Sequence, residues 1–143
     1  MRGSRRRARE DALQVLYQLD MNETVTPAAG LAHFESSFNP EGGAIDEFTR
    51  RLVIGVAENV ATLDAAISKH ATHWRKDRMP AVDRNILRLG IFELEHCDDI
   101  PATVTIDEMV ELAKGFGSEA SPAFVNGVLD KIKASLNRPA KAK

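Results

Sequence analysis

Four arginines near the N-terminus are the residues whose chemistry stands out first: Arg5, Arg6, Arg7 and Arg9. A guanidinium keeps its charge and presents planar donors that pair with phosphate, and its plane can stack on an unpaired base. The cluster lies at the start of a predicted helix, where the helix dipole favours acidic side chains. Helix stability therefore does not explain it. The pattern favours nucleic-acid binding, and the alternative is a basic terminus that only aids solubility.

The remaining polar residues show no spacing typical of catalysis or metal binding. His70 and His73 are three residues apart, and His96 stands beside Cys97. A zinc site needs three or four converging ligands, usually announced by paired Cys-x-x-Cys or His-Glu-x-x-His motifs, which this chain lacks. A glycine-rich phosphate loop and a catalytic triad spacing are missing as well. We therefore expect no catalytic residues, no metal and no cofactor.

The composition is that of a folded domain in a reducing compartment. The 143 residues are 43% hydrophobic and 28% charged, which supports one core with a solvated surface. The net charge is −2 although both ends are basic, so the middle of the chain is acidic. A single cysteine excludes an internal disulfide framework. No apolar run approaches a membrane span and no secretory signal is recognisable, so we expect a cytoplasmic protein.

Apolar residues recur every three to four positions, which predicts an all-α fold that must position the arginines. The expected helical stretches are about 8–19, 27–38, 45–74, 80–97, 105–117 and 121–136. The stretch 45–74 is long for one helix, and Thr62 as an N-cap would divide it near 60–62. We expect six or seven helices in a single domain, 1–143, with flexible basic termini at about 1–5 and 138–143.

Local signals predict where several helices begin and end. Pro80 suits the first turn of one helix, and Ser121 with Pro122 opens the last, which Pro139 would bound. Thr105 and Glu108 have the spacing of a capping box, which predicts a helix start at Thr105. That helix should end at a glycine, Gly115 or Gly117.

Several side chains have both a structural and a functional interpretation. We expect Asp83, Arg84, Arg88 and Glu93 to form structural ion pairs rather than a surface for a partner. Trp74 continues an apolar stripe and should be buried, whereas Tyr17 lies off the stripe of its helix and should be exposed.

Asn126 and Gly127 are unusual inside the last predicted helix, because glycine costs a helix about 1 kcal/mol relative to alanine. For Gly127 we expect close packing of a neighbouring helix. Asn126 has two equal interpretations, a polar contact to a loop or RNA, and simple exposure.

Four segments resemble the NusB family, in order along nearly the whole chain. They are Arg5–Tyr17 with its Arg-Arg-Arg-Ala-Arg-Glu start, Arg84–Leu94 followed by Ile100-Pro101, Glu108–Gly117, and Phe124–Asp130 with its Phe-Val-Asn-Gly-Val-Leu run. Residues 20–45 match poorly, and we assign them no role. The resemblance implies two packed helical sub-bundles and no enzyme activity.

NusB-like proteins bind the boxA element of nascent RNA, usually with NusE, a small-subunit ribosomal protein. The complex joins RNA polymerase with other Nus factors and suppresses premature termination, notably on ribosomal RNA operons. By position, the resemblance implies RNA-binding roles for Arg5, Arg6, Arg7, Arg9, Gln14, Lys114, Phe124 and Asn126. It implies contacts with NusE for Tyr17, Asp83 and Arg84.

Two other functions remain open at this point. One is the same helical domain associated with ribosomal RNA, as in the N-terminal part of ribosomal-RNA cytosine methyltransferases, although 143 residues leave no room for their cofactor-binding domain. The other is a protein-interaction bundle without an antitermination role. The residues do not distinguish a monomer from a homodimer.

Overall fold

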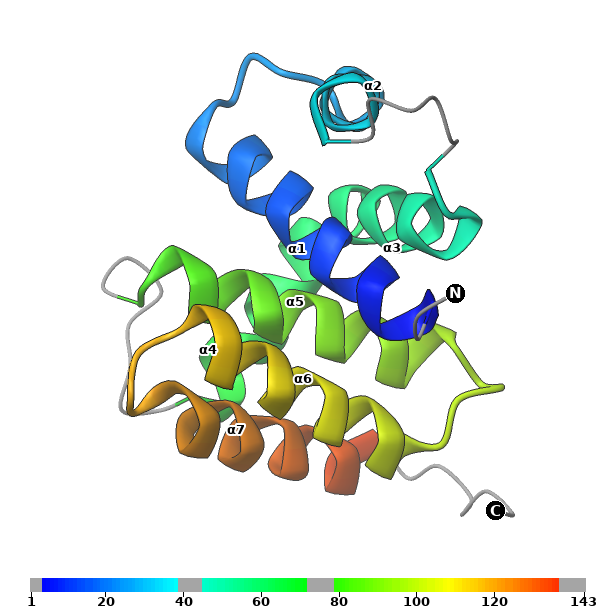
Figure 1. The fold of residues 1–143 in the computed structure, drawn as a ribbon. Helices are drawn as coiled ribbons and strands as arrows, with labels where there is room; N and C mark the ends of the chain where they lie inside the picture. The colour runs from blue at the N-terminus through cyan, green and yellow to red at the C-terminus, as the bar shows by residue number, and fades with distance from the viewer. Residues whose placement is uncertain (1–3, 39–44, 72–78, 137–143) are drawn as a thin grey trace. The chain divides into compact units, whose positions relative to one another are not determined.

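The computed structural model describes residues 4–38, 45–71 and 79–136, which form two compact units, Met1–Glu58 and Asn59–Lys143. Within those ranges the chain has seven helices and no strand (Figure 1). The all-α prediction and the division into two helical sub-bundles are confirmed.

The first unit contains α1 (Ser4–Met21), α2 (Pro27–Phe38) and α3 (Glu47–Glu58), and each of these helices packs against the other two. Side-chain caps fix two helix starts. The Thr26 hydroxyl accepts a hydrogen bond from the Ala29 amide, and the Asp46 carboxylate accepts one from the Phe48 amide at 2.8 Å. The buried side chains of the unit come from one face of each helix: Ala12, Leu13, Val15, Leu16, Leu31, Phe34, Phe48, Leu52, Val53 and Val56.

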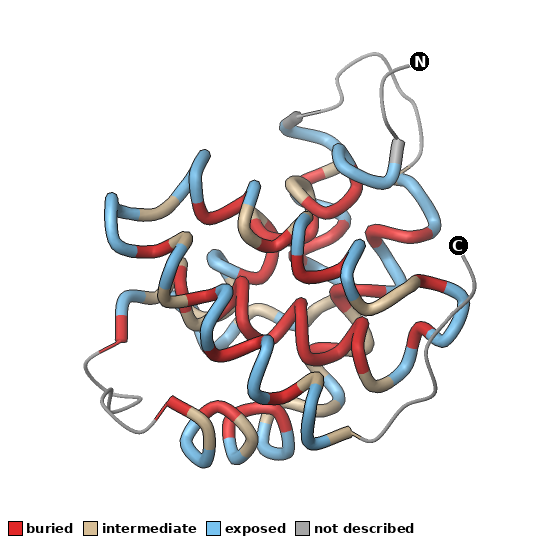
Figure 2. Tube along the Cα trace, turned by 90° about the horizontal axis from the view of Figure 1, so that it is seen from below, coloured by how far each residue is buried: buried red, intermediate tan, exposed pale blue. Residues whose placement is uncertain are grey.

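The second unit contains α4 (Val60–His70), α5 (Ala81–His96), α6 (Ala102–Phe116) and α7 (Ser121–Leu136). Helix α5 packs against α4, α6 and α7, and it is buried along most of its length (Figure 2). Gly90 permits this packing, since a Cβ there would lie 2.9 Å from Leu129 Cδ1 and 3.0 Å from Met109 Cγ. The stretch 80–97, predicted as one helix, thus contains the most buried helix of the described ranges.

Two predicted N-caps are wrong, and both hydroxyls lie inside a helix. The break between α3 and α4 falls at Asn59, so Thr62 is an exposed residue of α4. Helix α6 begins at Ala102, directly after Pro101. Thr105 is therefore one turn inside it, fully buried, and donates its hydroxyl to Glu93 at 2.9 Å. Two other predicted boundaries agree, with Gly117 as the C-cap of α6 and Ser121 at the start of α7. Pro80, predicted in the first turn of its helix, is the residue directly before α5.

Some expectations concern residues outside the described ranges: the buried Trp74, the second histidine His73, the bounding Pro139 and the basic tail. The described residues contain no helix both long and apolar enough to span a bilayer.

Candidate nucleic-acid interface

The first turns of α1 present the predicted arginine cluster to solvent. Arg5, Arg6 and Arg7 are exposed, while Ala8 and Ala12 are buried and hold the opposite side of the helix in the unit. The first turn of α1 contains no acidic residue. Arg7 Nε lies 3.1 Å from Asp11 Oδ1, an exposed pair one turn apart. The sequence thus places three guanidinium groups on one exposed helix end, where the dipole already carries positive charge.

Phe48 of α3 packs against the guanidinium groups at the start of α1. The Arg5 guanidinium lies over the Phe48 ring, with Cζ 4.2 Å from its centroid, and Arg9 approaches the same ring at 5.3 Å. Such stacking fixes the plane of a guanidinium while leaving its N–H donors at the edge. Arg9 is only 3% exposed, so in this structure it packs on Phe48 and departs from the expected RNA contact. Sequence reasoning missed Phe48.

Gln14 and Lys114 are the next two predicted RNA-binding residues, one in each unit. Gln14 lies two turns beyond the cluster on α1 and is half-buried. Lys114 is exposed near the end of α6, with Nζ 3.2 Å from Glu111 Oε2. Both side chains of the Lys114–Glu111 ion pair are exposed, so water and ions can replace either partner at little cost in free energy.

Phe124 and Asn126 lie in the first half of α7. Asn126 is exposed and Phe124 is half-buried, so an aromatic edge and an amide are presented on the same stretch of helix. Gly127 is also exposed, and a Cβ built on it would meet nothing within 4 Å. The expectation that Gly127 serves the packing of a neighbouring helix is therefore wrong for the described residues.

Asp83 and Ser121 position the start of α7. The Ser121 hydroxyl donates to Asp83 Oδ1 at 2.7 Å and accepts the Ser118 amide at 3.0 Å. A Cβ on Gly117 would lie 2.6 Å from Ser121 Oγ, so only glycine leaves room for this serine. Asp83 is 4% exposed. In this structure it is a structural residue, which departs from the partner contact expected of it.

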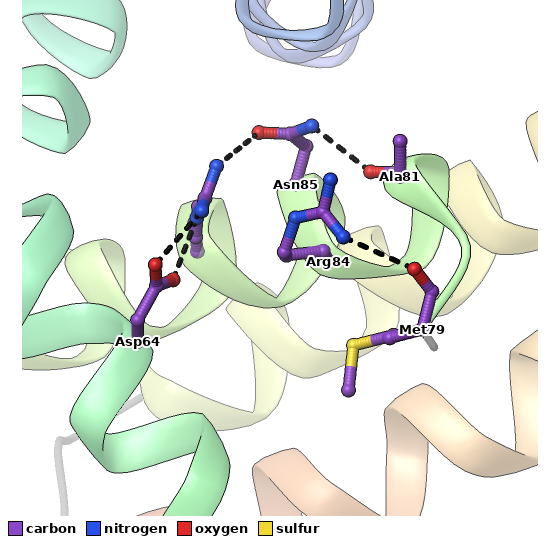
Figure 3. Close-up of polar contacts among 6 residues, drawn as sticks. Asp64, Met79, Ala81, Arg84 and Asn85 are labelled. Atoms are coloured by element: carbon purple, nitrogen blue, oxygen red, sulfur yellow. Dashed lines mark hydrogen bonds and ion pairs between the residues drawn. The ribbon is translucent and has the colours of Figure 1, made fainter. Parts of the chain in front are cut away.

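Arg84 and Arg88 both make polar contacts from the first half of α5, and Figure 3 shows Arg84 beside Met79. Arg84 is half-buried and donates from Nη1 to the Met79 carbonyl at 3.0 Å. Arg88 forms a two-pronged ion pair with Asp64 of α4, at 2.8 and 2.9 Å, and also donates to Asn85. The expected structural ion pairing holds for Arg88, but its carboxylate comes from α4. Glu93 instead accepts the Thr105 hydroxyl.

A groove between α1 and α2 surrounds Tyr17, the remaining predicted partner residue. Its volume is about 550 Å³, and its lining includes Met21, Val25, Ala29 and His33. Tyr17 is 40% exposed and Met21 56% exposed, which confirms the predicted exposure of the tyrosine. Exposed apolar side chains around a hollow are typical of a surface that binds another molecule.

Comparison with known proteins identifies relatives along nearly the whole chain. Residues 6–134 match the model of the NusB family. A transcription antitermination protein NusB from Myxococcus xanthus (strain DK1622) is 49% identical over 141 residues, covering 96% of this chain and 99% of the relative.

Solved structures agree in fold. One is the NusB of T. maritima, with a TM-score of 0.80, 34% identity, and coverage of 94% of this chain and 93% of that one. Another is a chain from the crystal structure of antitermination factors NusB and NusE in complex with dsRNA. It has a TM-score of 0.82 and 30% identity, and the match covers 94% of this chain and 99% of that chain.

Proposed function

The chain belongs to the NusB family, and from that membership we propose that it is a transcription antitermination factor that binds boxA RNA together with NusE. It acts in the cytoplasm as part of an RNA polymerase complex with other Nus factors, suppressing premature termination on ribosomal RNA operons. It does so by binding and not by catalysis.

The exposed arginine cluster at the start of α1 is the observation that supports RNA binding most directly. Arg5, Arg6 and Arg7 add positive charge to the positive end of a helix dipole, which lowers helix stability. A phosphate backbone reverses this penalty, because it brings negative charge to the same place. The stacking of Arg5 on Phe48 holds one guanidinium in a defined plane before RNA arrives. The cluster is thus better suited to a ligand than to the free fold.

The ion pairs that Arg7 and Lys114 make within the chain do not prevent phosphate binding. Exposed pairs such as Arg7–Asp11 and Lys114–Glu111 typically contribute about 0.2–1 kcal/mol. A phosphate offers a stronger acceptor for the same donors, and binding also releases counterions from the RNA. RNA binding should therefore exchange these pairs at small cost.

We assign to α7 a role in reading unpaired bases. Phe124 offers an aromatic surface for stacking, and Asn126 offers an amide for base-edge or ribose hydrogen bonds. The Asp83–Ser121–Ser118 hydrogen bonds fix the turn from which α7 starts. These two residues therefore stand on a helix whose first turn is anchored in the core of its unit.

The Tyr17 groove is the proposed surface for NusE. A protein partner gains from covering Tyr17 and Met21, whereas RNA does not need an apolar groove. Replacing Tyr17 with Ala should weaken NusE binding about tenfold, as expected for an aromatic anchor. Binding measured by calorimetry checks this, with Gln18→Ala, a polar residue that lines the same groove, as the matched variant. Equal affinities for Tyr17→Ala and the parent protein would move the NusE surface elsewhere.

The charge balance explains why a partner is needed. The chain has a net charge of −2, so its arginine cluster is a local feature on an otherwise acidic protein. RNA affinity without NusE should therefore be weak, and NusE should add surface and charge. Titrating labelled boxA RNA with and without NusE, beside a scrambled RNA of equal length, tests the proposal. Stronger and sequence-dependent binding with NusE is expected; equal binding of both RNAs would contradict it.

A further inference from the structure

The described helical glycines differ in what surrounds them. A Cβ on Gly30 of α2 would lie 2.9 Å from Leu19 Cδ2, and one on Gly90 of α5 would lie 2.9 Å from Leu129 Cδ1. At both glycines a neighbouring side chain would have to shift to make room for a Cβ. Gly127 stands in the middle of the 16-residue α7, and a Cβ there meets no atom within 4 Å. The described fold has ample room for a side chain at Gly127.

The backbone of Gly127 does not require glycine either. No positive φ is found there, and the residue continues a regular helix. Glycine in a helix interior is less favourable than any other residue except proline, because the unfolded chain loses more freedom. Gly115 is equally open, but it lies in the last turn of α6, where a helix tolerates glycine more easily. Gly127 therefore carries a cost that the folded chain alone does not offset.

The neighbours of Gly127 on α7 are side chains that suit a nucleic acid. Phe124 lies three residues before it and Lys131 four residues after it, so both border the same patch of helix surface. Asn126 is adjacent, exposed, and able to donate and accept hydrogen bonds. Lys131 is the only described cation of α7 within one turn of Gly127, and the acidic Asp130 also borders the patch. A phosphate would therefore have to approach from the Lys131 side.

We propose that Gly127 is an RNA-binding position at which the RNA backbone lies directly on helix α7. The missing side chain brings the ribose-phosphate chain within contact distance of the helix. At that depth a base can stack on Phe124, the Asn126 amide reaches the ribose or base edge, and Lys131 reaches a phosphate. This inference rests on the proposed RNA-binding function and adds Gly127 and Lys131 to the residues that perform it.

The test separates RNA contact from folding because the two effects have opposite signs. Gly127→Ala should raise the melting temperature by about 3 °C, as the helix gains a better helix former. The same change should weaken binding of boxA RNA in the presence of NusE about tenfold, the equivalent of one lost polar contact. Gly127→Met, with a longer side chain and similar helix propensity, should weaken it further. Ala65→Met adds similar bulk to an exposed position of α4 and should leave RNA affinity unchanged.

Each other outcome overturns the inference. Parent-like RNA affinity in Gly127→Ala and Gly127→Met would leave the proposed function intact and remove Gly127 from the RNA surface. A lowered melting temperature in Gly127→Ala would show that the fold itself needs this glycine. An equal loss of affinity in Ala65→Met would assign the effect to bulk in general. Absence of RNA binding by the folded parent protein with NusE would overturn the proposed function, and this inference with it.

Discussion

Two arginines in this protein, Arg88 and Arg7, pair with carboxylates, and their surroundings give them different roles. Arg88 is 7% exposed and pairs with Asp64 through two hydrogen bonds across 24 residues of sequence. Arg7 is exposed and pairs with Asp11 only one turn away. A buried guanidinium without its carboxylate would be an uncompensated charge, whereas an exposed one is solvated by water. Burial therefore decides which arginines hold the fold together and which remain available to RNA.

Breaking the buried pair should give the largest effect. Asp64→Ala leaves Arg88 with its charge and without its two-pronged partner, so we expect the free energy of unfolding to fall by about 3–5 kcal/mol. Urea denaturation followed by circular dichroism measures it. The double variant Asp64→Leu with Arg88→Met removes both charges and should recover much of the loss. A loss below about 1 kcal/mol in the single variant would refute the structural role of this pair.

Removing the exposed arginine cluster should lower RNA affinity and leave the stability of the fold nearly unchanged. With Arg5, Arg6 and Arg7 all changed to Ala, boxA affinity in the presence of NusE should fall roughly hundredfold, at about 1 kcal/mol for each lost phosphate contact. The unfolding free energy should change by less than about 1 kcal/mol, since surface substitutions have small effects. Fluorescence anisotropy and urea denaturation of the same sample check both. Parent-like RNA affinity would remove the cluster from the interface.

Phe48 connects the exposed arginine cluster to the core of its unit. Replacing it should lower RNA affinity less than removing the three arginines does. Phe48→Leu keeps an apolar side chain but removes the ring under Arg5, so RNA affinity should fall about two- to fivefold, in line with a cation–π contact of 0.5–1 kcal/mol. Val56→Ala, two turns further along the same helix, is the control, because it destabilises α3 at a buried position away from that ring. If both variants lost RNA affinity equally, the loss would reflect stability and not the orientation of Arg5.

Breaking the exposed Arg7–Asp11 pair should change stability and RNA affinity least. It should raise RNA affinity, whereas the variants above lower it. Asp11→Asn removes the carboxylate 3.1 Å from Arg7 Nε, so stability should drop by only about 0.3–0.5 kcal/mol. RNA affinity should rise about twofold, since phosphate no longer competes with Asp11 for the guanidinium. Anisotropy at low salt measures the change. Reduced RNA affinity would mean that Asp11 orients Arg7 for binding.

Helix ends could be predicted from the sequence wherever a local signal decides them. Ser121 and Gly117 each mark a boundary that the structure confirms. Thr105 shows the limit of such signals. Its spacing to Glu108 fits a capping box, yet its hydroxyl bonds Glu93 of the neighbouring helix, because Pro101 already starts α6 one turn earlier. A hydroxyl that suits two partners goes to the one that tertiary packing provides.

The site could be predicted in part. Clustered charge is visible in the sequence, so the exposed Arg5, Arg6 and Arg7 were expected, whereas the burial of Arg9 depends on packing that the sequence does not reveal. Phe48 is 43 positions from Arg5 and has no local signal that links it to RNA. Gly127 is different, because the buried Val125, Val128 and Leu129 already define the inner face of its helix. That pattern already indicates an outward-facing Gly127, so the packing role that we expected from the cost of a helical glycine overlooked it.

The salt dependence of RNA binding tests the central claim most directly. The logarithm of the association constant for boxA RNA with NusE is plotted against the logarithm of salt concentration, for the parent protein and the triple variant of Arg5, Arg6 and Arg7. Three phosphate contacts to a single strand predict a parent slope steeper than that of the variant by about 2. Equal slopes for the two proteins, or a flat parent slope, would contradict the assignment of these guanidinium groups to RNA phosphates.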